Sequence, residues 1–284
     1  MTQSDGFFSG RLAVITGGSS GIGLALAQQL AREGARVWIV ARRQEGLVKA
    51  LESLSPIAGH GHGMVDANLS HWAIAEAAAK RIKEKAGVPD LLFNCAGAVE
   101  PGYVEEIPLE HYREMMAINY FGTVHMVKAL LPSMLERGTG HIVNFSSVGG
   151  YIAVAGYAAY SPSKYAVRAF SDVLRCELKP RGLKVSVVFP PDTDTPQLAY
   201  EKSHKAPELV QLQEDGGLGP FRFGVHSPQK VAEEVLQAVR RGSYIILPGK
   251  VNFALYHVAR LVGNLVYSIV DDEWRAARRK HGKA

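Results

Sequence analysis

Short apolar runs of β type alternate with longer helical patterns over the first two thirds of the chain. The β-type runs lie at 12–16, 37–40, 63–65, 91–93, 142–145 and 185–189. Helical patterns follow the first run to about residue 32 and recur at 71–84, 109–131 and 161–178. This alternation predicts a parallel sheet with crossover helices. The expected fold is therefore α/β, with a doubly wound, mostly parallel sheet and helices on both of its faces.

The pattern changes beyond the last of these runs. Residues 196–226 are polar and rich in Gly and Pro, which is typical of a lid or a binding loop. Regular patterns then return as a helix at 229–241, a short strand at 244–247 and an apolar stretch at 251–270. We therefore expect a domain at 1–250, which includes a substrate loop at about 196–226, and a C-terminal apolar helix with a basic tail at 251–284.

The apolar stretch 251–270 is as long as a membrane span needs, but polar side chains interrupt it. Asn252, His257, Arg260 and Asn264 follow roughly one side of a helix. This favours a helix that lies in a membrane interface, where the basic tail would meet anionic headgroups. The alternative is an amphipathic helix that packs on the domain or at an oligomer interface. We expect the protein to form a homo-oligomer, either a dimer or a tetramer.

Composition narrows the classes of function. Of the 284 residues, 47% are hydrophobic and 21% are charged, which is ordinary for one large globular domain. The net charge is +5, and much of the positive charge lies in the C-terminal tail. The sequence shows neither a basic recognition helix nor aromatic residues placed to stack on bases, so no nucleic acid is expected as a partner. Two cysteines and a polar N-terminus without a signal pattern predict a cytoplasmic protein, free or peripheral on the cytosolic face of a membrane.

The sequence TGGSSGIG at 16–23 joins the first predicted strand to the first predicted helix. Glycines let the backbone turn tightly and approach a pyrophosphate, and the following helix presents its N–H groups and positive dipole end to phosphates. The turn therefore indicates a Rossmann-type dinucleotide site. The residues expected to bind the cofactor here are Gly17, Ser19, Ser20, Gly21, Ile22 and Gly23.

The end of the second strand distinguishes NADP from NAD. NAD sites usually place an acidic residue there, whereas an arginine accommodates the 2′-phosphate of NADP. Here Arg42 and Arg43 follow the strand, and a guanidinium group is suited to a phosphate. The alternative for Arg43 is a solvated helix start. The expected cofactor is NADPH/NADP+.

Further motifs follow in order: Asp66, NCAG at 94–97, Asn119, a pair of serines at 146–147, and Tyr160 with Lys164. Together with the glycine turn, they resemble the short-chain dehydrogenase/reductase family over about residues 8–195. The resemblance implies hydride transfer between a nicotinamide and a carbonyl/alcohol pair. It also implies cofactor contacts at Asp66, Ala67, Asn94, Ala96, Gly97, Tyr160, Lys164, Pro190, Thr193 and Thr195.

The reaction explains the catalytic residue types. Hydride delivery to a carbonyl carbon leaves an alkoxide, which must be protonated as it forms. Tyr160 would donate that proton, and the charge of Lys164, one helical turn later, would favour tyrosinate. Ser147, which the family's spacing favours over Ser146, would stabilise the substrate oxygen. The resemblance gives Asn119 the role of holding a water that relays protons to Lys164.

The segment FPPDTDTP at 189–196 is unusual, because Pro191 replaces the family's Gly. With Glu201 and Lys202 after it, this run resembles the branch of 3-ketodihydrosphingosine reductases. That branch implies NADPH-dependent reduction of a long-chain lipid ketone in sphingolipid biosynthesis. Two departures are Gly46, where the branch has a lysine, and a C-terminus with weaker transmembrane character. The alternatives are a reductase of another ketoacyl, steroid or small ketone substrate, and a non-catalytic dinucleotide-binding scaffold.

Four other residues are interpreted structurally. His60 and His62 lie between glycines without Cys or acidic partners, so we expect a solvated loop and no metal site. Cys95 is expected to be a small buried residue and not a nucleophile. Cys176 is expected to lie in the core.

Overall fold

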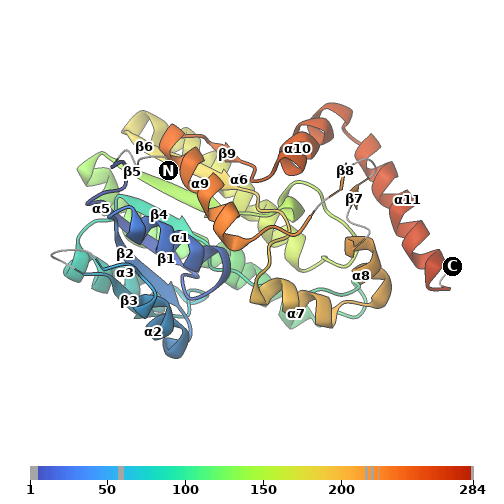
Figure 1. Ribbon diagram of the computed structural model, residues 1–284, viewed down its shortest axis with the longest axis horizontal. Helices are drawn as coiled ribbons and strands as arrows, with labels where there is room; N and C mark the ends of the chain where they lie inside the picture. Colours follow the sequence, from blue (N-terminus) through green and yellow to red (C-terminus); the bar gives the residue numbers. More distant parts are fainter. Residues whose placement is uncertain (1–5, 57–60, 215–216, 219–220, 223, 283–284) are drawn as a thin grey trace.

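A sheet of seven parallel strands runs through the protein in the order β3-β2-β1-β4-β5-β6-β9 (Figure 1). The structure is a computed structural model and describes residues 6–56, 61–214, 217–218, 221–222 and 224–282. The strands are β1 (Leu12–Thr16), β2 (Arg36–Ala41), β3 (Gly63–Asp66), β4 (Leu91–Asn94), β5 (Gly140–Phe145), β6 (Leu183–Val188) and β9 (Ile245–Ile246). The strand order reverses between β1 and β4, so the expected doubly wound fold is confirmed. Such folds bind ligands at this reversal, outside the carboxyl ends of the strands.

Helices cover both faces of the sheet. On one face lie α1 (Gly21–Arg32), α2 (Gln44–Glu52) and α9 (Pro228–Arg241); on the other lie α3 (Trp72–Ala86), α5 (Gly122–Arg137) and α6 (Tyr160–Leu178). Strand β1 is apolar throughout because both of its faces are buried. Ala13 and Ile15 pack into the first layer, whereas Leu12 and Val14 pack into the second. Helix α2 was not among the helices expected from the sequence.

The single helix expected at 109–131 is divided. Helix α4 (Leu109–Met115) leads into a π-helical turn, Met116–Phe121, and α5 continues beyond it with Pro132 inside. A π-helical turn contains more residues than an α-helical turn, so it changes the direction of the side chains that follow. Asn119 lies in this turn and is buried.

The expectation of an irregular loop at 196–226 was wrong, because two helices form there. Helices α7 (Pro196–His204) and α8 (Pro207–Glu214), which we call the lid, precede the short antiparallel strands β7 (Gly217–Leu218) and β8 (Phe221–Arg222). Each lid helix begins with proline, whose missing N–H is no loss at the first helical position. Thr195 caps α7, since its hydroxyl accepts from the Leu198 N–H at 3.3 Å.

The apolar stretch at 251–270 also differs from the single helix that was expected. Helices α10 (Lys250–Val262) and α11 (Leu265–Lys280) are bent by 117° at the break between them. Gly263 at this break has a φ of 56°, which favours glycine. No single helix in the described part of the chain is long and apolar enough to cross a membrane, although the bent pair taken together meets the test of length and composition.

Helix α10 is held to the domain by a buried asparagine. The Asn252 amide donates to the carbonyl oxygens of Phe189 at 2.7 Å and Pro248 at 3.1 Å. Its oxygen accepts from the Tyr151 hydroxyl at 2.6 Å. The expectation that the polar residues of this stretch share one outward side was therefore wrong at Asn252, because Asn252 faces the core.

Two structural interpretations also need correction. The His62 ring accepts from the Val37 N–H at 3.1 Å and bonds to the Ser55 carbonyl at 2.8 Å, so it ties its segment to β2 and is not merely solvated. His60 lies outside the described residues. Cys176 is exposed on α6 and is not a core residue. Among the residues described here, no group of His, Cys, Asp and Glu is arranged to hold a metal ion.

Candidate active site

The glycine turn lies at the reversal of strand order, beside the ends of β1 and β4. Gly17 has a φ of 68°, and a Cβ on Gly23 would lie 2.4 Å from the Gly17 carbonyl oxygen, so neither position accommodates a side chain. The Ala96 N–H donates to the Thr16 hydroxyl at 3.0 Å, which fixes the NCAG segment against the turn. The Ser20 side chain makes no capping bond to α1, so the backbone N–H groups at the N-terminus of this helix are available to phosphate oxygens. The turn therefore fits a dinucleotide pyrophosphate.

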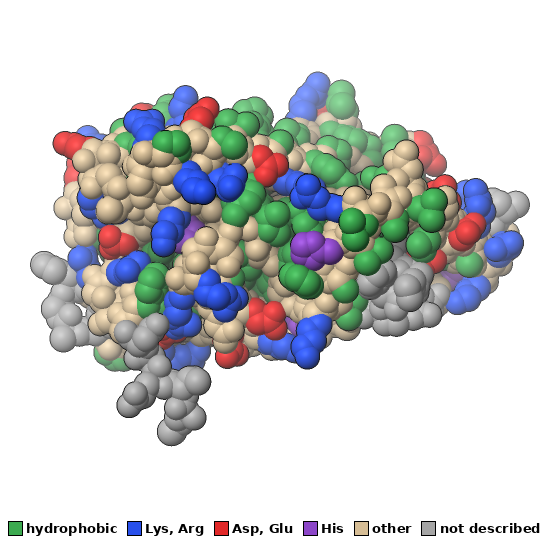
Figure 2. Space-filling model, turned by 90° about the horizontal axis from the view of Figure 1, so that it is seen from above, with side chains coloured by type: hydrophobic (Ala, Val, Ile, Leu, Met, Phe, Trp, Pro, Cys, Tyr) green, Lys and Arg blue, Asp and Glu red, His purple; other side chains and the backbone are tan. Residues whose placement is uncertain are grey.

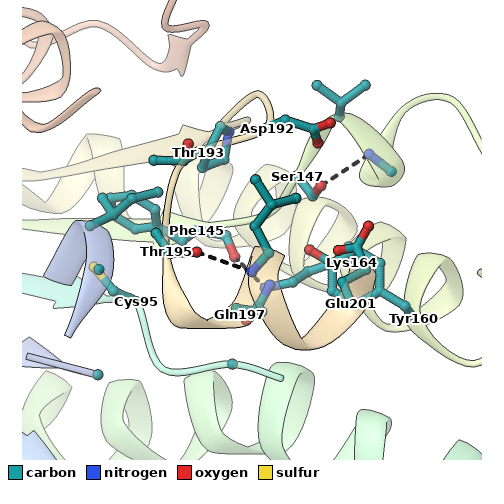
Figure 3. Close-up of a pocket in the computed structure, with 18 of the residues that line it drawn as sticks. Cys95, Phe145, Ser147, Tyr160, Lys164, Asp192, Thr193, Thr195, Gln197 and Glu201 are labelled. Atoms are coloured by element: carbon teal, nitrogen blue, oxygen red, sulfur yellow. Dashed lines mark hydrogen bonds between the residues drawn. The ribbon is translucent and has the colours of Figure 1, made fainter. Parts of the chain in front are cut away.

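A cavity of about 420 Å³ extends from the glycine turn to the lid (Figure 3). The predicted site residues that line it are Gly17, Ser19, Ser20, Gly21, Ile22, Gly23, Arg42, Arg43, Ala67, Ala96, Gly97, Ser147, Tyr160, Lys164, Pro190, Thr193 and Thr195. The fold thus brings residues from most of the chain to one place. Their individual roles stay predictions.

Three of the predicted residues do not line the cavity. Asp66 is exposed at the end of β3. Asn94 is buried, and its amide donates to the Asn144 side-chain oxygen at 2.9 Å, which joins β4 to β5. Asn119 is buried behind the cavity wall. Arg43 is the residue before α2, as its alternative interpretation held, and it also lines the cavity.

Tyr160 and Lys164 lie on the first turns of α6, and both are buried. The Lys164 ammonium donates to the Phe145 carbonyl at 3.1 Å and lies 5.7 Å from the centre of the Tyr160 ring. Burial lowers the pKa of Lys164 to about 8. Burial likewise raises the pKa of Tyr160, a change that the bond from Ser147 opposes and the charges of Glu201 and Asp192 reinforce.

The pKa of Tyr160 departs from the sequence-based expectation. The charge of Lys164 was expected to favour tyrosinate, but burial dominates and the opposing contribution comes from Ser147. A raised pKa keeps the tyrosine protonated near neutral pH. This is the state that can donate a proton during carbonyl reduction.

The two neighbouring serines have different surroundings. Ser146 is 3% exposed, and its hydroxyl donates to the Lys164 carbonyl at 2.8 Å. Ser147 begins the short helix Val148–Gly150, where its oxygen accepts from the Gly149 N–H at 3.1 Å, and it also bonds to Tyr160. The geometry therefore favours Ser147 as the partner of a substrate oxygen.

Asn119 fixes the backbone that faces the catalytic lysine. Its amide donates to the Ala98 carbonyl at 3.0 Å and the Ser163 hydroxyl at 2.9 Å, and its oxygen accepts from the Ala98 N–H at 2.9 Å. A Cβ on Gly97 would lie 2.8 Å from that oxygen and 3.2 Å from the Lys164 nitrogen. Asn119 thus positions the segment between the cofactor turn and Lys164. The relay of protons through a water stays a prediction.

Cys95 lines the cavity and is half-buried. Burial raises its pKa well above the usual range, so the thiol is protonated and unreactive near neutral pH. This agrees with the interpretation that Cys95 is not a nucleophile.

One part of the site was not expected from the sequence. Tyr157, Asp192, Glu201, Lys205 and Gln213 form a hydrogen-bonded network on the cavity wall beneath the lid. Glu201 and Lys205 are four residues apart, a spacing that places two side chains on one helical face. That spacing is the available signal, but the Gly and Pro residues of the segment predict a loop.

Comparison with known proteins places the chain in a family. A sequence model described as short chain dehydrogenase matches residues 11–206. The chain belongs to this family. As a short chain dehydrogenase it is an oxidoreductase whose cofactor is a nicotinamide dinucleotide, which the cradle formed by Gly17, Gly23 and α1 fits.

Its relatives are consistent with the branch that the sequence resembles. The chain is 36% identical to a 3-dehydrosphinganine reductase of Danio rerio and 34% identical to a 3-ketodihydrosphingosine reductase of Mus musculus. Each match covers 83% of this chain and 70% of the relative. The resemblance to this branch is therefore confirmed.

Solved structures of short chain dehydrogenases have the same fold. One, from Burkholderia phymatum in complex with NAD, matches with a TM-score of 0.77 and 27% identity, over 91% of this chain and 95% of that one. An L-sorbose reductase from Gluconobacter frateurii, complexed with NADPH and L-sorbose, matches with a TM-score of 0.74 and 26% identity, over 86% and 97% of the two chains.

Proposed function

We propose that this short chain dehydrogenase reduces 3-ketodihydrosphingosine to dihydrosphingosine with NADPH. The observation that carries the proposal is the apolar lining of the cavity beyond Tyr160. The apolar side chains there are Ile152, Val154, Leu198, Leu209, Leu212 and Val270. A lining of this kind suits an alkyl chain, and the relatives named for this reaction support the choice of substrate.

The preference for NADPH rests on the residues after β2. Arg42 and Arg43 line the cofactor end of the cavity, and no acidic residue lies between the strand and α2. Their guanidinium groups would hold the 2′-phosphate, which a carboxylate at this point would repel. Ser19 and Ser20 line the same end and add hydroxyl donors.

The mechanism follows from the geometry around Tyr160. When bound, NADPH supplies the hydride. Ser147 and Tyr160 hold the ketone oxygen between their hydroxyl groups, and Tyr160 gives that oxygen its proton as negative charge develops on it. Lys164, held by the Phe145 carbonyl, provides a positive charge beside the tyrosine. The lid closes one side of the cavity with apolar side chains, which exclude water from the reacting atoms.

A panel of ketones tests the proposal. The purified protein should oxidise NADPH faster with 3-ketodihydrosphingosine than with a short β-ketoacyl thioester, a steroid ketone or a small ketone, each compared by kcat/KM. Equal or faster turnover of the short ketones would overturn the lipid assignment. A second series with NADH in place of NADPH separates the assignment of the cofactor from that of the substrate.

We also propose that the bend between α10 and α11 touches the cytosolic face of a membrane. Leu261 is 85% exposed and Leu265 is 68% exposed, and Phe253 lies exposed on the same helix pair. Figure 2 shows hydrophobic side chains gathered on the half of the molecule that carries these helices, with Lys and Arg side chains around them. Apolar side chains beside basic ones suit an interface with anionic headgroups.

Liposome flotation tests this contact. The double variant Leu261→Glu/Leu265→Glu should leave the anionic liposome fraction, whereas the control Ile74→Glu, at an exposed position on α3, should remain bound. If neither variant changes flotation while the first one splits an oligomer in size-exclusion chromatography, the exposed bend is an interface between copies of the chain and the membrane contact is refuted.

A further inference from the structure

The cavity wall carries an ion-pair network that the mechanism above does not use. The Lys205 ammonium contacts the Glu201 carboxylate and the Tyr157 hydroxyl, and it donates to the Gln213 side-chain oxygen at 2.7 Å. The Gln213 amide donates in turn to the Asp192 carboxylate at 2.8 Å. These five residues form one connected group, and all of them line the cavity.

This network adjoins the catalytic tyrosine. The rings of Tyr157 and Tyr160 have their centres 5.9 Å apart. Figure 3 shows Asp192 on the side of Ser147 and Glu201 on the side of Tyr160. Both carboxylates raise the pKa of Tyr160 through their charge, in addition to the effect of burial. Their field therefore acts where the ketone oxygen would bind.

The charges within the network do not balance. Lys205 forms an ion pair with Glu201, and both side chains are almost fully buried. Asp192 receives a bond from the neutral amide of Gln213 and forms no ion pair with any residue that the structure describes. Burial raises the pKa of Asp192, and the bond from Gln213 and the charges of Lys205 and Lys202 offset this shift only in part. A carboxylate in such surroundings is stabilised when a cation reaches it, so this wall favours a positively charged group in the cavity.

We propose that Asp192, reinforced by Glu201, forms a subsite for a primary ammonium on the carbon next to the ketone. This inference rests on the proposed function, because 3-ketodihydrosphingosine carries a protonated amine at that carbon. With the ketone oxygen between Ser147 and Tyr160, the ammonium lies one carbon away, on the side of Asp192. It balances the excess negative charge of the wall and weakens the repulsion that opposes ionisation of Tyr160. The amine of the substrate thereby assists the proton transfer.

Two ketones of equal chain length provide the test. They are 3-ketodihydrosphingosine and 1-hydroxyoctadecan-3-one, which lacks the amine, each assayed with the full-length protein and NADPH. The measured quantity is the ratio of their kcat/KM values. We expect the native protein to favour the amino ketone by about tenfold or more, as one charge-assisted hydrogen bond in a buried site implies. Asp192→Asn should bring the ratio close to one, and Glu201→Gln should lower it by a smaller factor.

A matched control separates loss of the subsite from damage to the lid. Glu208 lies on α8, is 1% exposed and accepts a hydrogen bond from the Tyr103 hydroxyl, but it does not line the cavity. Glu208→Gln should therefore keep the native ratio. Melting curves of all variants show whether each one is folded.

The outcomes separate this inference from the proposed function. Equal turnover of the two ketones by the native protein overturns the ammonium subsite and leaves the lipid reductase in place. A loss in Asp192→Asn that is equal for both ketones and is matched by weaker NADP+ binding overturns the subsite too, since Asp192 would then be a counter-charge to the cofactor. No turnover of either ketone, with turnover of another ketone, overturns the proposed function and the subsite with it.

Discussion

The two ends of the cavity differ in what lines them. At the cofactor end the wall consists largely of backbone, from the glycine turn and the N-terminus of α1, together with the cations Arg42 and Arg43. At the substrate end it consists of side chains from the lid, from α11 and from the segment after β6. The charged groups of that second wall include three carboxylates, Asp192, Glu201 and Glu273, and the ammonium of Lys205.

This difference shows how the protein divides its tasks. Backbone groups and a helix N-terminus recognise phosphates whatever the neighbouring side chains are, so the cofactor end suits any reductase of the family. Side chains determine the charge and apolar surface at the other end, so that end determines the ketone. Ser147, Tyr160 and Lys164 lie between the two ends. Substitutions should therefore affect one end and leave the other intact.

The largest effect is expected from Tyr160→Phe, which removes the proton donor and keeps the ring. We expect kcat to fall by at least about two powers of ten, because acid–base catalysis contributes about that much or more. NADPH binding, followed by fluorescence titration, should stay within a few-fold of the native value. A variant that keeps more than about a tenth of the native kcat would contradict the role of Tyr160.

Lys164→Met tests the charge between the two ends. The pKa of Lys164 is lowered to about 8 from an ordinary value of 10.5, so the unfolded chain binds more protons than the folded one between these pH values. The native protein should therefore gain stability as the pH rises through this window. At pH 7 the free energy of unfolding of the variant should exceed that of the native protein by up to about 3 kcal/mol. This gap between the two proteins should close toward pH 10.

Urea unfolding at the two pH values measures that gap. Lys49→Met, at an exposed position on α2, is the control for the exchange of a lysine for methionine. If the free energies of unfolding of the native protein and of Lys164→Met change in parallel with pH, burial does not lower the pKa of Lys164.

Arg42→Asp tests the cofactor end with a smaller expected effect. The substitution removes a charge-assisted contact to the 2′-phosphate and adds repulsion, so the KM for NADPH should rise by about tenfold or more, whereas that for NADH should change little. The KM for the ketone should also stay unchanged, since Arg42 lies away from the lid. Lys49→Asp provides a matched charge reversal outside the cavity. Equal weakening of both cofactors would refute the assignment of Arg42 to the phosphate.

The cofactor end could be predicted from the sequence because its signals are local. Gly17 and Gly23 lie within one turn; Gly17 has a positive φ, and a Cβ on Gly23 would meet the Gly17 carbonyl oxygen, so both requirements arise within a few residues. Tyr160 and Lys164 are one helical turn apart, so their shared face also follows from the sequence. Apolar runs such as 12–16 also predict strands that are covered on both faces of the sheet.

The lid could not be predicted in the same way. Pro196 and Pro207 were interpreted as signs of a loop, yet each begins a helix. The ion-pair network joins Tyr157 to Glu201 and Lys205, across more than forty residues of sequence, and no local pattern indicates such a pairing.

The sequence by itself indicated the strands of the parallel sheet, the dinucleotide turn and the candidate catalytic residues, because each signal depends on neighbours within a few positions. Only the tertiary structure decided where the polar residues of the C-terminal region point. Asn252 faces the core because the carbonyl of Phe189 and the hydroxyl of Tyr151 need partners there, whereas Leu261 and Leu265 are exposed where the chain bends at Gly263. A buried hydrogen-bonding group is satisfied by whichever residue the fold brings to it, and that residue can come from anywhere in the chain.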